Sequence, residues 1–143
     1  NEIDINYSFF DALDLDFSNI LVKNLKVNNA KNDCLDFSFG NYKIQNANLT
    51  NCGDKGFSVG EKSKLNLKNG FVASSKIGVA SKDEAITNIQ EIRMKEIDLC
   101  LSAYKKKKEF QGSKIIINKF NCNNYKIKQE SDNLSEISIL TEY

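Results

Sequence analysis

Three aspartates lie in short alternating segments that repeat along the chain, and they have the clearest chemical potential. Asp14 and Asp16 lie in residues 13–17, and Asp36 lies at the matching place in residues 35–39. Apolar and polar residues alternate there, so the three carboxylates should point outward from half-buried strands. If the two strands are neighbours, the carboxylates lie within roughly 5 to 7 Å of one another. Such a group can act as acid and base in glycoside hydrolysis, or bind Ca²⁺.

The rest of the sequence gives this enzyme hypothesis little support. The chain has no histidine and a single arginine, and no basic residue stands near those aspartates. A solvated outer face is therefore expected, with no catalytic activity, no metal and no cofactor. A polysaccharide-processing enzyme that uses Asp14, Asp16 and Asp36 is the alternative. Further aspartates precede the same strands and should shape turns by accepting bonds from backbone amides, with calcium binding as their alternative role; these are Asp11, Asp33, Asp54 and Asp98.

A run of four lysines is the second candidate site. Lys105, Lys106, Lys107 and Lys108 stand between Tyr104 and Phe110, in the only repeat that is longer than its neighbours. Its extra residues should form a loop whose rings either stack on sugars or anchor the loop. This loop could hold an anionic polysaccharide by long-range attraction, and a plain solvated loop is the alternative. Lysines at comparable corners could extend it into a basic ridge, namely Lys43, Lys62, Lys64 and Lys82.

The four cysteines lack the spacing of a metal site. Cys34 and Cys52 form the only pair expected on neighbouring repeats, whereas Cys52 and Cys122 should lie three repeats apart, beyond the reach of a disulfide. Four free thiols, including Cys100, are therefore expected.

These candidates are positioned by a repeat of about 22 residues, whose period indicates a solenoid. Aliphatic residues mark the start of each copy, and the starts are 22, 23, 22, 26 and 22 residues apart; the markers are Val22, Ile44, Leu67, Ile89, Ile115 and Ile137. Each repeat also carries a second short alternating strand, and turn formers such as Gly53-Asp54 separate the strands. The sequence thus predicts an all-β fold, a right-handed parallel β-helix of about six coils.

Asn24, Asn46 and Asn69 occupy one position on three successive coils. Stacking at roughly 4.8 Å per coil would bring their amides into hydrogen-bonding distance and form a buried asparagine ladder. Glu91 takes the next position, so the ladder should end there.

These asparagines with their flanking aliphatics, and the blocks at residues 33–40 and 54–60, resemble the pectin-lyase-like parallel β-helices, including NosD-type repeats. The resemblance covers roughly residues 3 to 139. Residues 103–110 also resemble a loop in solenoids that accompany CotH-type kinase modules of bacterial surface proteins. The family implies the fold and a preference for carbohydrate partners.

Composition sets the remaining expectations. The 143 residues suit a single domain, and 20 basic against 19 acidic residues leave no overall field that would attract nucleic acid. No apolar stretch is long enough to span a membrane. The first coil starts within a strand, so the chain is expected to be the C-terminal part of a longer one, with another chain or domain over that coil. A non-catalytic segment of a surface or secreted bacterial protein is the leading hypothesis, and a self-assembling solenoid is a further alternative.

Overall fold

The computed structural model describes residues 1–143 and contains strands, turns and one long loop, without helices. The first four strands are β1 (Glu2–Ile5), β2 (Leu13–Asp16), β3 (Asn19–Ala30) and β4 (Leu35–Ser38). Longer strands that bend around the core follow, and the last is short. These are β5 (Asn41–Val59), β6 (Lys64–Lys82), β7 (Ile86–Tyr104), β8 (Lys114–Ser131) and β9 (Glu136–Glu142).

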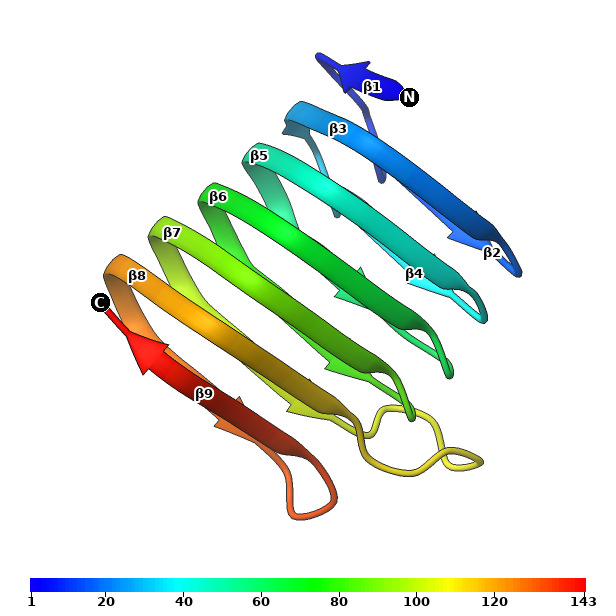
Figure 1. The fold of residues 1–143 in the computed structure, drawn as a ribbon, viewed down its shortest axis with the longest axis vertical. Coiled ribbons are helices and arrows are strands. Elements are labelled where there is room, and N and C mark those ends of the chain that lie inside the picture. The colour runs from blue at the N-terminus through cyan, green and yellow to red at the C-terminus, as the bar shows by residue number, and fades with distance from the viewer.

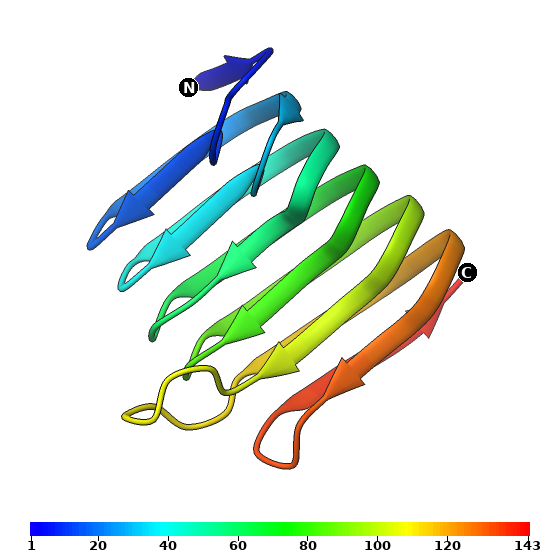
Figure 2. The same ribbon diagram turned by 180° about the vertical axis from the view of Figure 1, so that it is seen from behind.

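Every strand pairs in parallel with its equivalent one coil away, in the order β1-β3-β5-β6-β7-β8-β9. The front strands run one way and the back strands return behind them, so that the chain winds as a right-handed β-helix of about six coils (Figures 1 and 2). We call the outward side of β1, β3, β9 and the N-terminal halves of β5–β8 the front face. The back face is the outward side of β2, β4 and the C-terminal halves of β5–β8. The predicted fold class is confirmed.

The register agrees with the predicted repeat except in the long coil. Val22 pairs with Ile44, and Leu67 pairs with Ile89. Ile89, however, pairs with Ile117 instead of Ile115, which makes that coil 28 residues long. The extra residues form the loop between β7 and β8, seen in yellow at one corner of Figure 1.

The core fills the space between the front and back strands with side chains such as Leu25, Phe37 and Phe57, which are fully buried. Where the back strands begin, two consecutive residues face inward. A Cβ on Gly78 would lie 2.3 Å from the Met94 sulfur, so this position points into the core. Strict alternation along the back strands predicts that Gly78 and Cys100 point outward. That prediction is wrong. The row that contains Ser58 continues through Ala80 and Ser102, and all three residues are buried.

The asparagine ladder is present. Asn46 Nδ2 donates to Asn24 Oδ1 at 2.9 Å, and Asn69 Nδ2 donates to Asn46 Oδ1 at 3.0 Å. Glu91 is the next residue in register, where the ladder ends as predicted. The predicted burial is wrong, because Asn46 and Asn69 are exposed on the front face.

Each coil also turns at one residue in the left-handed region, where asparagine is tolerated better than most residues. These residues are Asn29, Asn51, Ser74, Glu96 and Asn124, with φ between 54° and 62°.

Candidate functional site

The predicted aspartates line up on the back face. Asp14 pairs with Asp36, which in turn pairs with Ser58, while Asp16 pairs with Ser38. The carboxylates thus form two rows on the first coils, and hydroxyl groups take over on the following coil. Parallel stacking places like charges on adjacent coils, which is unfavourable. Consistent with this, burial and then the charges of Asp36, Asp16 and Asp11 raise the pKa of Asp14.

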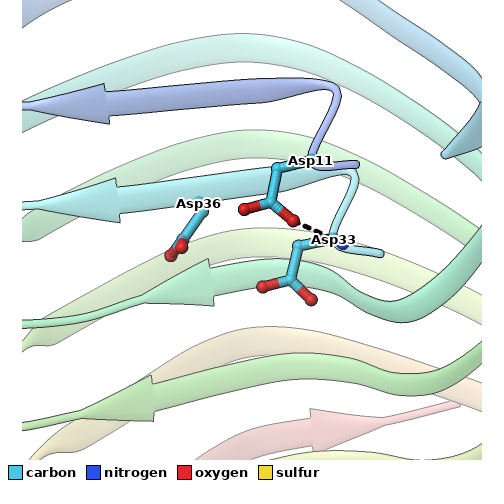
Figure 3. Close-up of side chains that lie close together, drawn as sticks. All are labelled: Asp11, Asp33 and Asp36. Carbon is cyan, nitrogen blue, oxygen red and sulfur yellow. Dashed lines mark hydrogen bonds between the residues drawn. The ribbon is translucent and has the colours of Figure 1, made fainter. Parts of the chain in front are cut away.

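A second set of carboxylates lies beside these rows. Asp11, Asp33 and Asp36 each offer an oxygen within 4.8 Å of the others, as Figure 3 shows. Asp11 Oδ1 accepts hydrogen bonds from the Asp33 amide at 2.9 Å and from Asn32 Nδ2 at 2.6 Å. Asp33 Oδ1 accepts one from the Lys55 amide at 3.0 Å. Asp11 and Asp33 therefore accept bonds from backbone amides as predicted, but these amides belong to the following coil, so the bonds fasten one coil to the next instead of shaping a turn.

Asp33 is the most perturbed carboxyl of this group. It is 4 % exposed, and burial raises its pKa to about 6, against the opposing charge and amide of Lys55. A carboxyl with a raised pKa beside other carboxylates is an arrangement that can supply a general acid and a base in one site. Sequence reasoning gave Asp33 a turn-shaping role, with calcium binding as the alternative, and did not predict its burial.

Two lysines lie among these acids. Lys55 Nζ is 2.6 Å from Asp54 Oδ2 and 3.7 Å from Asp33 Oδ1. Lys82 is 7 % exposed, and its side chain crosses Gly60, where an added Cβ would lie 3.0 Å from Lys82 Cε. Burial lowers the pKa of Lys82, and the charge of Asp36 opposes that shift. The aspartates were expected to lack a basic neighbour; Lys82 forms no ion pair with them, but its charge and that of Asp36 interact across an intervening coil.

The long loop lies against the corner that joins the back strands to the front strands. Asp83 Oδ1 accepts hydrogen bonds from the amides of Lys106 and Lys107 at 2.7 and 2.9 Å. Lys107 Nζ forms an ion pair with Glu61 Oε1 at 2.8 Å. Burial raises the pKa of Glu61, but hydrogen bonds from Lys107 and Ser38 outweigh burial and hold it below its usual value. We call this region the loop corner, formed by residues 61–64, 83–85 and 105–113.

The candidate ligand-binding residues divide into two groups. Phe110 is 9 % exposed and lies 6.1 Å from the ring of Phe39, so it anchors the loop. Tyr104 is half-buried on the back face, where burial raises its pKa and Lys55 opposes the shift. The lysines instead stay at the surface: Lys106, Lys107 and Lys108 are exposed, and Lys105 is half-buried. Only Lys107 forms an ion pair.

The loop lies closer to the aspartate rows than the sequence indicated. Glu61 connects the loop with the aspartate rows. Its Oε1 pairs with Lys107, and its Oε2 accepts a hydrogen bond from Ser38 Oγ at 2.5 Å. Ser38 is paired in register with Asp16. Lys82 departs from the predicted basic ridge because it is buried on the back face, whereas Lys43, Lys62 and Lys64 are exposed.

All four cysteines form disulfides, Cys34–Cys52 and Cys100–Cys122, with Cα–Cα distances of 5.3 and 6.7 Å. The expected free thiols are thus a wrong prediction. The error arises because two consecutive residues face inward where each back strand begins. Cys34 and Cys100 therefore both point into the core, toward a front strand of the next coil. The shifted register of the long coil also hid the second pair, because Cys122 stands opposite Met94.

Comparison of the chain with protein-family models, with curated proteins and with solved structures found no match. The chain forms no helix with the length and apolarity needed to cross a bilayer. The geometry therefore defines the class of fold, a parallel β-solenoid with a polar back-face cluster beside a clamped basic loop.

Proposed function

We propose that this chain is a non-catalytic β-solenoid segment of a surface or secreted protein, and that it contacts anionic polysaccharide at the loop corner. The observation that carries the proposal is how the loop is held. Backbone amides of Lys106 and Lys107 bind Asp83, and only the Lys107 ammonium is used as well, in its ion pair with Glu61. Lys105, Lys106 and Lys108 form no ion pair, and fixed, unpaired charges attract a polyanion at a low ordering cost.

Neighbouring side chains favour the same ligand. Lys62 and Lys64 are exposed on the turn that follows Glu61, where Lys107 is bound. The corner therefore presents several ammonium groups from two adjacent coils. The resemblance to pectin-lyase-like and NosD-type solenoids, and that of the loop to solenoids beside CotH-type modules, agrees with a carbohydrate partner.

The two disulfides support the proposed location outside the cell. Cys34–Cys52 and Cys100–Cys122 use every cysteine of the chain. Such bonds persist in oxidising compartments and are rare where thiols are kept reduced.

The proposal is tested by measuring Kd for acidic and neutral glycans at two salt concentrations. Changing Lys105–Lys108 to serine should weaken the binding of the acidic glycans by about tenfold or more and reduce its salt dependence. A matched control removes four exposed lysines elsewhere that form no ion pair, namely Lys31, Lys76, Lys95 and Lys119. Binding that survives the loop change, or is lost equally in the control, would contradict the loop as the site.

A glycan-cleaving enzyme is the second candidate, favoured by one observation: Asp33, with its pKa of about 6, lies beside Asp36. Incubating the same glycans with the protein and following new reducing ends tests it. Cleavage that disappears in Asp36→Asn, with folding retained, would establish this candidate and overturn the non-catalytic proposal.

A further inference from the structure

The two faces of the solenoid differ in charge over the same coils, because the front face is purely basic and the back face mixes acids with lysines. On the coils formed by β3, β5 and β6, every charged side chain of the front face is a lysine. The acids of these coils lie on the back face and in the turns that flank it, together with Lys55 and Lys82. The five lysines are Lys23, Lys26, Lys43, Lys64 and Lys68, and none of them forms an ion pair or donates a side-chain hydrogen bond.

A groove crosses this basic face. It has a volume of about 420 Å³, and its lining contains lysines and amides but no acidic residue. Lys43 and Lys68 supply the charges, and exposed Leu21 and Ile116 supply apolar surface. The amides come from successive coils and include Gln45, Asn66, Asn88 and Gln90.

The amides of the groove keep unused hydrogen-bonding groups. Asn88 Nδ2 donates to Asn66 Oδ1 at 3.2 Å, which uses one of the two N–H groups of Asn88 and one lone pair of Asn66. Gln45 and Gln90 make no side-chain hydrogen bond and are exposed. Amides offer donors and acceptors together, so they match the hydroxyl groups of a sugar. Their repetition at ~4.8 Å per coil suits a polymer that runs along the solenoid axis.

The groove leads to the loop corner. A neighbouring hollow of about 560 Å³ shares Leu21, Lys43 and Asn66 with it and includes Lys64. Lys64 stands in the turn next to Glu61, which binds Lys107 of the loop. Basic side chains thus continue from the exposed loop onto the front face.

We infer that the front-face groove is the main binding site for an extended anionic polysaccharide, with Lys43 and Lys68 binding its carboxylate or sulfate groups. The amides bind its hydroxyls, and the loop holds one edge of the chain. This inference rests on the proposed function for the class of ligand, but places the principal contacts on the front face. The groove lacks an aromatic ring on which nucleotide bases could stack, which disfavours single-stranded nucleic acid.

The experiment compares three variants with the wild-type chain by calorimetric titration: Lys43→Ser with Lys68→Ser, the loop change Lys105–Lys108 to serine, and a control with Lys31→Ser and Lys76→Ser. The control removes the same charge from exposed, unpaired positions outside the groove. The probes are oligogalacturonate, which carries carboxylates, heparin oligosaccharide, which carries sulfates, neutral dextran, and a single-stranded oligonucleotide. Circular dichroism checks that each variant is folded.

The groove variant should weaken oligogalacturonate or heparin binding by about tenfold or more, and more than the loop variant does. The control should bind like wild type. Affinity should also rise with oligosaccharide length, because longer chains meet more coils. Full binding by the groove variant with loss in the loop variant would overturn this inference and leave the proposed function standing. No binding of either acidic glycan to wild type would overturn both, and so would equal or tighter binding of the oligonucleotide.

Discussion

The front and back faces of the solenoid are built on the same repeat, yet they stack different side chains. On the front face, Asn24, Asn46 and Asn69 occupy one row and bond to one another in the open. On the back face, the row that begins Asp14, Asp36 is interrupted by Ser58. An amide is both donor and acceptor, so identical copies satisfy each other, whereas identical carboxylates repel.

The back face resolves this repulsion by different means on different coils. Asp11 and Asp33 bind amides of the following coil, and Lys55 pairs with Asp54 and Asp33. Lys82 brings a positive charge across Gly60 from the next coil. The comparison teaches that a solenoid can repeat neutral polar groups without limit, but must vary charged ones from coil to coil.

The largest loss of stability should come from removing a disulfide that joins the front face to the back face. The bridge Cys34–Cys52 joins a back strand to the front strand of the next coil. Replacing both cysteines with alanine should lower the free energy of unfolding by about 2 to 4 kcal/mol, chiefly by freeing the unfolded chain. Denaturant titration with and without a reductant measures it. A variant as stable as the oxidised wild type would show that packing alone holds the faces together.

The charge of Asp33 should destabilise the back face at neutral pH. Because its folded pKa of about 6 lies above its ordinary value of 3.8, the folded state holds the proton more tightly. The contribution of this group to stability should therefore fall as pH rises from about 4 to about 6. Asp33→Asn should remove that fall in stability. The free energy of unfolding of the variant relative to wild type should therefore be about 1 to 2 kcal/mol higher at pH 8 than at pH 4, after allowing for partial solvation.

Unfolding titrations at pH 4 and pH 8 test the Asp33 prediction. Asp98→Asn is the control, because that exposed residue lies before the same strand on a later coil. An equal pH dependence in wild type and Asp33→Asn would contradict the role assigned to burial.

Breaking the amide row should cost less, because it is exposed. Asn46→Ala removes the middle residue of the ladder and should lower stability by about 0.5 to 1.5 kcal/mol. Asn48→Ala is the matched control on the same strand, since Asn48 is exposed and makes no side-chain hydrogen bond. Equal melting temperatures for the two variants would mean that the ladder adds nothing to stability.

The smallest effect concerns the loop corner. Glu61→Gln removes the ion pair with Lys107, which is partly solvated, and should cost about 1 kcal/mol or less. The folded pKa of Glu61 is lowered, so its contribution is present above the unfolded pKa and lost as pH falls through the folded value. The protection of the amides in residues 106–111, measured relative to their intrinsic exchange rate at each pH, should therefore fall in acid for wild type, and already at neutral pH in the variant. Glu109→Gln, an exposed change in the same loop, should leave exchange unaltered.

Much of the fold could be predicted, because the period of the aliphatic residues reports directly which side chains fill the core. The same logic gave the pairing of Asp14 with Asp36 and the ladder through Asn46. It failed where the chain departs from strict alternation. The inward pair at Gly56 and Phe57 reversed the expected direction of Cys100, and with it the disulfides.

The candidate site was less predictable because its environment comes from distant coils. The charges of Lys82 and Asp36 interact across another coil, and Phe110 meets Phe39 only because the loop folds back along the corner. Alternation says which way a residue points, but not how far a long side chain extends along the stack. The front-face groove was missed for another reason: its lysines are scattered in the sequence and gather only when the coils are stacked.

The two bridges also bear on how the solenoid would respond to a pulling force. Coils at either end should peel away in sequence, but each bridge takes the residues between its cysteines out of the extensible chain, with separations of 18 and 22 residues. At roughly 3.5 Å per residue, the oxidised chain should stretch about 140 Å less than the reduced one. The segment between Cys52 and Cys100 remains free to unwind. The middle coils would therefore be the extensible part of a molecule that is cross-linked near both ends.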